Sequence, residues 1–306
     1  MRQILVTGGA GFIGSHTVDL LLAQGKNVVV FDNLLSGKLS NLDLSHPQLK
    51  FIQGDILDYP ALFAAMADCD AVLHLAALPS VPKSIEDPIG SLRVNTQGFL
   101  HILQSIREMK KSIRLVYASS AAVYGAAERL PCSDEWQPNG LLSPYALEKA
   151  SNEYYADLFA RLFGITSLGL RYFNVYGVRQ DPDSPYSGVI SKFIEWYQRD
   201  RAITIFGDGK QSRDFIYVSD IARANALALQ NDYCGVLNVA TGVPETLQNL
   251  VQYIEAVGGK PARLNYAAAR AGDIIESYAK VDSAEKHLGF RSETPLAQGI
   301  RSLLAN

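Results

Sequence analysis

The chain has 306 residues and a net charge of −3 at pH 7, with 28 basic against 31 acidic side chains. This length suits about two domains, and the balanced charge gives no electrostatic basis for binding nucleic acid or an anionic membrane. No apolar run approaches the ~18 residues of a membrane span, and the dispersed cysteines Cys69, Cys132 and Cys234 suit neither a zinc site nor a disulfide framework. We therefore expect no metal, and a cytoplasmic location because a strand-like run rather than a signal peptide opens the chain.

The first half of the chain alternates short apolar runs with amphipathic segments. Runs at 3–7, 26–31, 49–53, 71–75, 113–118 and 166–170 predict strands, and segments at 12–24, 89–109 and 143–163 predict helices. In segment 12–24, for example, apolar residues recur with a helical period at Ile13, Val18, Leu21 and Leu22. Because continuous apolar strands alternate with helices, we expect an α/β fold with a parallel sheet covered on both faces.

The pattern changes after Asn174. Turn signals at 181–185, 206–209 and 258–259 interrupt it, and shorter helices are predicted around 191–199, 218–230 and 247–257. We therefore expect a first domain over residues 1–174 and a smaller lobe over residues 175–306, from which strands and helices can cross back to the first domain.

A glycine-rich turn joins the first predicted strand to the first predicted helix, with glycines at Gly8, Gly11 and Gly14. In such a turn the first glycine permits the tight bend, the second lets the backbone approach a pyrophosphate, and the third lets the helix pack on the sheet. The helix N-terminus then offers free N–H groups and a favourable dipole to the phosphates. The pattern predicts a dinucleotide site; the alternative is a glycine turn without a ligand.

Asp32 ends the second predicted strand, eighteen residues after Gly14. A carboxylate at this place bonds the ribose 2′-hydroxyl and repels a 2′-phosphate, so NAD is favoured over NADP. The alternative is that Asp32 and Asn33 only begin a turn.

Tyr145 and Lys149 lie four residues apart in a predicted helix. Four residues make about one helical turn, so the phenol and the ammonium share a face. An adjacent ammonium favours the phenolate and would lower the pKa of Tyr145 from a usual value of roughly 10. This makes Tyr145 a candidate general base or acid, because the pair follows a dinucleotide turn.

These motifs together resemble the extended short-chain dehydrogenase/reductase family, and within it the nucleotide-sugar 4-epimerases. The similarity runs essentially end to end and is carried further by segments 74–77, 117–125, 171–177, 207–215 and 270–273. The resemblance implies a Rossmann-like doubly wound parallel sheet in an NAD-binding domain, residues 1–174. It also implies a smaller mixed α/β C-terminal substrate lobe, residues 175–306, that binds the nucleotide sugar.

The resemblance assigns roles residue by residue. Ser120 and Tyr145 would contact the reacting hydroxyl, and Lys149 would also bind the nicotinamide ribose. The other implied cofactor-binding residues are Gly8, Gly11, Phe12, Ile13, Gly14, Asp32, Asn33, Asp55, Ile56, Ala76, Ala77 and Asn95. The implied substrate-binding residues are Ser80, Ser120, Tyr145, Asn174, Val189, Arg213, Arg270, Asp273 and Ser277.

The residues after Ser120 distinguish reactions within the family. Family dehydratases carry an Asp-Glu pair there, where this chain has Ala121 and Ala122, and related decarboxylases place a glutamate at the position of Ala122. Epimerisation is therefore favoured. Tyr145 would take the proton of the sugar 4-hydroxyl while C4 passes hydride to NAD⁺, and hydride would return to the other face of the 4-keto sugar. The alternatives are an oxidoreductase with net NAD turnover and a non-catalytic NAD-sensing protein.

Ser277 aligns with the family's gate residue beside the sugar 2-position, where a small residue leaves room for an N-acetyl group. Segments 80–84 and 179–182 also resemble the UDP-N-acetylglucosamine 4-epimerase subgroup. We therefore expect interconversion of UDP-N-acetylglucosamine and UDP-N-acetylgalactosamine. The alternative, UDP-glucose and UDP-galactose, would follow if Tyr278 occupied the gate instead.

The predicted helices 89–109 and 143–163 carry apolar residues beyond one stripe: Phe99, Leu100, Leu103, Tyr155, Leu158, Phe159 and Leu162. In one interpretation all of them face the sheet. In the resembling family this helix pair forms a four-helix interface across a two-fold axis, which implies a homodimer.

Overall fold

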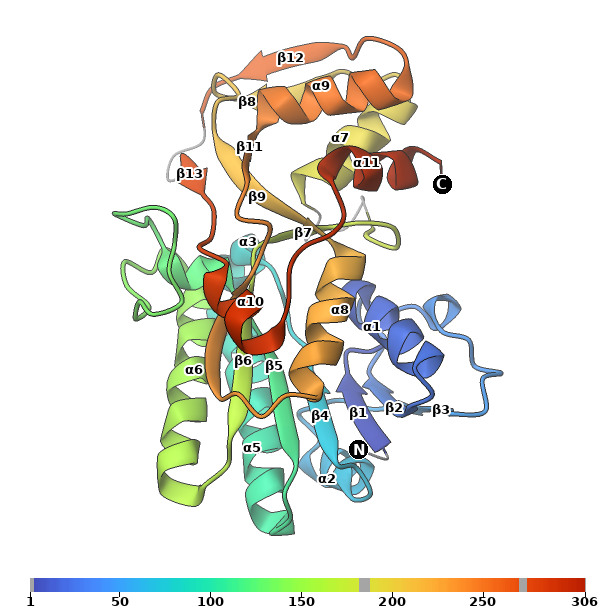
Figure 1. Ribbon diagram of the computed structural model, residues 1–306, viewed down its shortest axis with the longest axis vertical. Coiled ribbons are helices and arrows are strands. Elements are labelled where there is room, and N and C mark those ends of the chain that lie inside the picture. The colour runs from blue at the N-terminus through green and yellow to red at the C-terminus, as the bar shows by residue number, and fades with distance from the viewer. Residues whose placement is uncertain (1–2, 182–187, 270–273, 306) are drawn as a thin grey trace.

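A parallel sheet of seven strands dominates the computed structural model, which describes residues 3–181, 188–269 and 274–305. The strand order is β10-β6-β5-β4-β1-β2-β3, of which β6 to β3 are labelled in Figure 1. The strands are β1 (Gln3–Thr7), β2 (Asn27–Asp32), β3 (Leu49–Gln53), β4 (Ala71–His74), β5 (Arg114–Ser120), β6 (Ser167–Tyr172) and β10 (Gly235–Val239). The chain moves outward from β1 in one direction and from β4 in the other, so the order reverses between them. Ligands bind at such a switch point, beyond the carboxyl ends of the strands.

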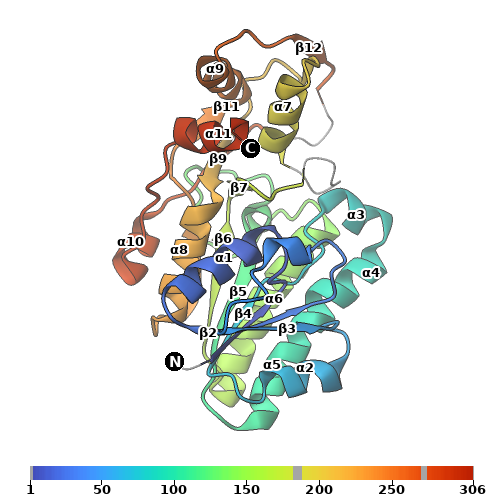
Figure 2. The ribbon, with the colours of Figure 1, turned by 90° about the vertical axis from the view of Figure 1, so that its right-hand side faces the viewer.

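Helices cover both faces of this sheet (Figure 2). On one face α1 (Phe12–Ala23) packs beside α8 (Val218–Leu229), over strand residues such as Val6 and Val30. On the other face lie α2 (Tyr59–Met66), α5 (Gly98–Met109) and α6 (Pro144–Phe163), over Leu5 and Val29. Because successive strand residues point to opposite faces, apolar strands supply both cores. The predicted doubly wound α/β fold is confirmed.

The segment predicted as one helix over 89–109 is helical throughout but not uniform. It begins as α4 (Pro88–Leu92), passes through a π-helical turn at Arg93–Gln97, and continues as α5. A short helix, α3 (Val81–Glu86), precedes it. Shorter 3-10 turns occur at Leu39–Asn41 and at Ala121–Tyr124.

Four strands of the second half form a separate mixed sheet in which β11 (Pro244–Thr246), β13 (Glu276–Ser277) and β7 (Asn174–Tyr176) all pair with β9 (Ser212–Tyr217). A further pair, β8 (Ile203–Phe206) and β12 (Leu264–Ala267), runs parallel. Helices α7 (Val189–Gln198), α9 (Leu247–Gly258) and α11 (Leu296–Leu304) enclose a second core and form the upper lobe in Figure 1.

The second half also returns to the first sheet. Strand β10 pairs with β6, α8 packs on α1, and α10 (Asp282–Leu288) contacts β10. The break at residue 174 is therefore a break in pattern along the chain, and elements on its two sides share one core. The assignment of cofactor binding to residues 1–174 and of nucleotide-sugar binding to residues 175–306 stays a prediction.

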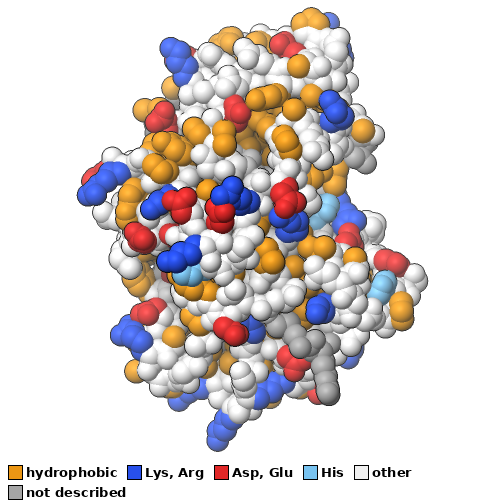
Figure 3. All heavy atoms as spheres, viewed as in Figure 1, with side chains coloured by type: hydrophobic (Ala, Val, Ile, Leu, Met, Phe, Trp, Pro, Cys, Tyr) orange, Lys and Arg blue, Asp and Glu red, His pale blue; other side chains and the backbone are white. Residues whose placement is uncertain are grey.

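Charged side chains of both signs are interspersed over the face shown in Figure 3, as the balanced composition led us to expect. Among the described helices none has the length and apolar character needed to cross a bilayer. The same part of the chain holds no group of three or more His, Cys, Asp or Glu side chains placed to bind a metal ion.

Candidate active site

A cavity of about 450 Å³ opens at the carboxyl ends of the parallel strands. It receives side chains or backbone from the glycine turn after β1, from the ends of β2 to β6, and from the start of α6. The predicted site residues that line it are Gly8, Gly11, Phe12, Ile13, Gly14, Asp32, Asn33, Asp55, Ile56, Ala76, Ala77, Ser120, Tyr145, Lys149 and Asn174. One cavity thus brings together the predicted catalytic residues and most of the predicted cofactor-binding residues.

The glycine turn forms because no larger residue fits it. Gly8 has a φ of +70°, and a Cβ at this position would lie 2.7 Å from the backbone N of Ala76. A Cβ on Gly14 would overlap the carbonyl oxygen of Gly8. Close packing of this kind brings the N-terminus of α1 to the cavity wall, where its free N–H groups suit a pyrophosphate. The turn therefore fits the phosphates of a dinucleotide.

Asp32 ties the glycine turn to the loop that follows β2. Its two carboxylate oxygens accept hydrogen bonds from the backbone N of Ala10 at 3.0 Å and of Leu34 at 2.8 Å. Beside it, Asn33 Nδ2 donates to Asp55 Oδ2 at 3.1 Å. Each carboxylate oxygen can accept more than one hydrogen bond, so Asp32 retains capacity for ribose hydroxyls in the cavity. Its charge and place fit the adenosine ribose of NAD.

The start of α6 positions Tyr145 and Lys149. Ser143 caps the helix by accepting a hydrogen bond from Ala146 N at 3.1 Å, and Pro144 occupies its first turn. Lys149 Nζ lies 5.8 Å from the centroid of the Tyr145 ring and donates to the carbonyl oxygen of Ala118 at 2.9 Å. The two side chains share one face, as their spacing predicts.

The predicted lowering of the Tyr145 pKa is wrong for the protein alone. Although part of Tyr145 is exposed to the cavity, desolvation raises its pKa to about 12, and a hydrogen bond with Ser120 offsets only part of this. Burial lowers the pKa of Lys149 to about 8, against the effect of nearby Glu148 and Glu153. Desolvation is the largest cause of both pKa shifts, and the lysine is already engaged with the carbonyl of Ala118.

Asn95 and Ser80 do not line the cavity. Asn95 is 1% exposed and is absent from the cavity lining; its amide instead bonds the backbone of Leu78, which does line the cavity. Ser80 caps α3 by accepting a hydrogen bond from Lys83 N at 3.2 Å. Both residues therefore act on the loop after β4 rather than at the cavity surface.

Three predicted substrate-binding residues, Asn174, Arg213 and Ser277, lie on the second sheet, and of these Asn174 alone lines the cavity. Asn174 lies on β7 opposite Phe215 of β9, and Ser277 on β13 lies opposite Arg213 of β9. Paired residues of neighbouring strands share a face, and so do residues two apart on one strand. Asn174, Arg213 and Ser277 therefore point to the same side of this sheet. Val189 begins α7.

Two predicted substrate-binding residues, Arg270 and Asp273, lie outside the described residues.

Segment 179–182 was noted only for its resemblance to a subgroup, and sequence reasoning did not predict that Arg179 and Asp181, on the loop after β7, line the cavity. Arg179 pairs with Asp19 at 2.7 Å, and Asp181 pairs with Lys38 at 3.1 Å. Arg179, Asp181 and Lys38 line the cavity, so this loop crosses from the second half to the cofactor loops. The turn-forming sequence at 181–185 was a signal for a loop, and nothing in it indicated the partner.

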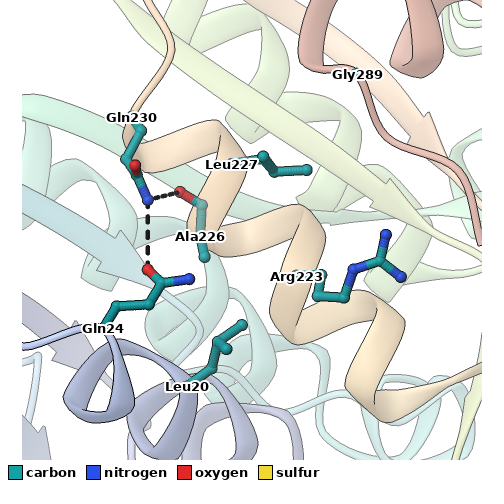
Figure 4. Close-up of a pocket in the computed structure, with 7 residues that line it drawn as sticks. All are labelled: Leu20, Gln24, Arg223, Ala226, Leu227, Gln230 and Gly289. Atoms are coloured by element: carbon teal, nitrogen blue, oxygen red, sulfur yellow. Dashed lines mark hydrogen bonds between the residues drawn. The ribbon is translucent and has the colours of Figure 1, made fainter.

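A second hollow, of about 270 Å³, lies between α1 and α8 (Figure 4). Gln230 Nε2 donates there to Gln24 Oε1 at 3.4 Å and to the carbonyl oxygen of Ala226 at 3.1 Å. Arg223 is already paired with Asp220 and Glu293. Because its polar groups bind one another, we interpret this hollow as a contact between the two halves of the chain.

Comparison with known proteins agrees with this geometry. The model of the NAD dependent epimerase/dehydratase family matches residues 4–240. A UDP-N-acetylglucosamine 4-epimerase from Methanobrevibacter ruminantium, solved with UDP-N-acetylmuramic acid, has a TM-score of 0.93 and 38% identity over 99% of this chain and 97% of that one. The UDP-glucose 4-epimerase of Thermotoga maritima, solved with UDP-glucose, has a TM-score of 0.94 and 35% identity over 99% and 98%. The UDP-glucose 4-epimerase of Thermus thermophilus, in complex with NAD, has a TM-score of 0.91 and 36% identity over 99% and 98%.

Proposed function

Since this chain belongs to the NAD dependent epimerase/dehydratase family, we propose that it is a UDP-sugar 4-epimerase that interconverts UDP-N-acetylglucosamine and UDP-N-acetylgalactosamine. This reaction class is supported above all by one observation: Ser120, Tyr145 and Lys149 line the same cavity as the glycine turn. NAD is the cofactor of the family, and the glycine turn and Asp32 fit it. Similar structures were solved with a UDP-sugar or with NAD, which supports the same pairing of ligands.

Three side chains carry the proton chemistry. Tyr145 takes the proton of the sugar 4-hydroxyl and later returns it, and Ser120 orients that hydroxyl by a hydrogen bond. Lys149, as an ammonium ion, stabilises the phenolate that forms on Tyr145. When bound, NAD would accept the hydride that leaves C4 of the sugar and return it to the same carbon.

The second sheet supplies the anchor for the nucleotide. Arg213 and Asn174 face the same side of it, and a guanidinium group suits phosphate oxygens because it offers several N–H donors in one plane. Arg270 and Asp273 are proposed to complete this anchor. Holding the nucleotide leaves the sugar free to present either face at the catalytic residues.

Ser277 supports the acetylated substrates. It is paired with Arg213, so its side chain lies on the same face as the proposed diphosphate site. The adjacent Tyr278 follows the end of β13, and its carbonyl oxygen accepts a hydrogen bond from Cys132 N at 2.9 Å. The pairing of Ser277 with Arg213 favours the small serine, rather than the tyrosine, as the residue beside the sugar.

The test is turnover of a panel of UDP-sugars by purified protein without added NAD, followed by separation of the products. We expect the N-acetylated pair to be the preferred substrates, and Ser277→Tyr to lower their turnover at least ~10-fold by occlusion, with less effect on UDP-glucose. Tyr278→Ser is the matched control and should leave the preference unchanged. Preference of the original protein for UDP-glucose, or normal turnover of UDP-N-acetylglucosamine by Ser277→Tyr, would contradict the gate assignment. A requirement for added NAD would favour the oxidoreductase.

A second copy of the chain is the proposed partner of an apolar surface on α3, α4 and α6. Ile85, Ile89, Leu147 and Leu162 are exposed on these helices, which pack against one another. Of the residues predicted for an interface, Phe99 and Leu103 lie in the core instead, whereas Tyr155 and Leu162 remain exposed. Exposed apolar side chains on helices that pack together suit an isologous interface.

For this homodimer we expect light scattering at micromolar concentration to give twice the chain mass of 33.4 kDa. Leu147→Glu should reduce that mass to one chain, because it places a charge in the interface, while Lys26→Glu, in the turn between α1 and β2, should not. A single-chain mass for the original protein would refute the proposal.

A further inference from the structure

Glu148 is a buried carboxylate immediately before the proposed catalytic lysine. It is 3% exposed, and its Oε2 accepts hydrogen bonds from Ser91 Oγ at 2.9 Å and from Asn95 Nδ2 at 2.6 Å. Its Oε1 has no hydrogen-bond partner among the described residues. A buried carboxylate with one oxygen unpaired is unfavourable for folding. Stability alone therefore does not account for an acidic residue at this position.

Asn95 connects Glu148 to the wall of the cavity. Asn95 Oδ1 accepts a hydrogen bond from Leu78 N at 2.8 Å, and its Nδ2 donates to Leu78 O at 3.1 Å. Since Nδ2 also donates to Glu148, the carboxylate reinforces the amide orientation that the bonds with Leu78 require; a flipped amide would turn its oxygen toward the negative charge. Glu148 thereby keeps Leu78, next to Ala77 in the cavity lining, in one backbone arrangement.

The charge of Glu148 also reaches the reacting groups. It raises the pKa of Lys149, against the dominant effect of burial, and it adds to the raised pKa of Tyr145. Both effects have the same sign, because a nearby negative charge favours the protonated form of either group.

The other ionisable groups around Lys149 are less able than Glu148 to act on it as an uncompensated negative charge. Glu153 also raises the pKa of Lys149, but Arg171 of β6 holds both of its oxygens, at 2.9 and 2.7 Å. His74 of β4 is neutral at pH 7, because burial lowers its pKa to about 3. Tyr117 of β5 is neutral too, since burial raises its pKa well above the usual value. Among the described residues, no lysine or arginine forms an ion pair with Glu148.

We propose that Glu148 is a positioning residue with two separable roles: its hydrogen bonds hold the Leu78 segment of the cofactor wall through Asn95, and its negative charge acts on the neighbouring buried Lys149. The second role rests on the proposed function, because it concerns the catalytic roles of Tyr145 and Lys149. The first concerns NAD binding alone.

Two substitutions separate these roles. Glu148→Gln keeps an acceptor oxygen for Ser91 and Asn95 but removes the charge. We expect both limbs of the pH profile of kcat/KM to move to lower pH by about one unit, since the pKa of Tyr145 and the pKa of Lys149 both fall. Affinity for NAD should stay near the original.

Glu148→Asp keeps the charge but withdraws the carboxylate by one methylene, so it weakens the bonds to Ser91 and Asn95. We expect an unchanged pH profile and a Kd for NAD raised about tenfold, the scale of one lost hydrogen bond to a charged group. Titrating NAD into apo-protein measures this. Glu86→Gln, exposed on α3, is the matched control and should change neither quantity.

Each role has its own contrary result. A Glu148→Gln profile that is lower in height but unshifted would overturn the role of the charge. An unchanged Kd for NAD in Glu148→Asp would overturn the role of the hydrogen bonds, and this measurement remains possible even if Glu148→Gln does not fold. Failure of the proposed function would appear instead in the unmodified protein, as no turnover of any UDP-sugar, while the NAD titration would still report on the first role.

Discussion

Replacement of Tyr145 by phenylalanine is expected to lower kcat for UDP-sugar epimerisation by at least ~10²-fold, the usual scale for losing general acid–base catalysis. Phenylalanine keeps the ring against the cavity wall and removes only the hydroxyl that exchanges the proton. The hydroxyl's hydrogen bond with Ser120 is lost as well, but α6 keeps its cap at Ser143. The fold and the affinity for NAD should therefore persist.

The measurement is steady-state turnover together with NAD titration and thermal unfolding of the same variant. Tyr266→Phe is the matched control, because it makes the same chemical change on exposed strand β12 and should retain full activity. The pKa of Tyr145 is about 12 in the protein alone, so kcat/KM should rise with pH wherever formation of the phenolate limits it. A folded Phe variant that keeps NAD and normal turnover would exclude Tyr145 as the proton-transferring group.

Local pattern was enough to predict six of the seven strands of the main sheet, but not β10. Strands β1 and β3 have the predicted bounds, 3–7 and 49–53, and the other four predicted strands differ by at most two residues at an end. Parallel strands buried on both faces are continuous apolar runs, so they are visible without knowledge of their neighbours. The short strands of the second sheet were not predicted, because two- to six-residue strands that border loops carry little pattern of their own.

The π-helical turn at Arg93–Gln97 could not be predicted from the local sequence pattern. Asn95 lies in this turn and bonds Leu78, seventeen residues earlier, and Glu148, 53 residues later. The apolar period of the segment is compatible with an uninterrupted α-helix. The turn from α-helix to π-helix therefore coincides with hydrogen bonds to residues far away in the sequence, which the segment's own pattern does not contain.

In the candidate site, too, some features follow from local sequence and others depend on tertiary structure. The glycine turn and the Tyr145–Lys149 pair depend on short spacings, so their geometry could be predicted. The pKa of Tyr145 could not, because desolvation depends on how tertiary structure encloses the ring. Ion pairs such as Lys38 with Asp181 join residues 143 apart in sequence, and no spacing rule identifies them.

A substitution that removes Arg171 from its buried ion pair with Glu153 is expected to cause the largest loss of stability among the substitutions considered. Arg171 is 2% exposed on β6, and its Nε and Nη2 donate to the two oxygens of Glu153 at 2.9 and 2.7 Å. Its Nη1 donates to Tyr124 Oη at 2.8 Å, and Glu153 Oε1 also accepts a hydrogen bond from Ser119 Oγ at 2.5 Å. The pair thus joins α6 and β6 to the segment that carries Ser120.

Arg171→Met fills a similar volume but leaves the carboxylate of Glu153 buried without a cation. We expect the free energy of unfolding to fall by about 3–5 kcal/mol, and Tm to fall by roughly 5–15 °C. Arg161→Met is the matched control on α6: its pair with Asp157, at 2.8 Å, is exposed, so its loss should amount to at most ~1 kcal/mol.

The double variant Arg171→Met with Glu153→Leu tests the reason for this loss. If an uncompensated charge causes it, removing the carboxylate as well should restore part of the stability, although Ser119 and Tyr124 then lose partners. If the cause is lost packing, the double variant should be less stable than Arg171→Met alone. Urea unfolding of the three variants and the original protein distinguishes these outcomes. A loss below ~1 kcal/mol for Arg171→Met would mean that the pair contributes no more than an exposed one.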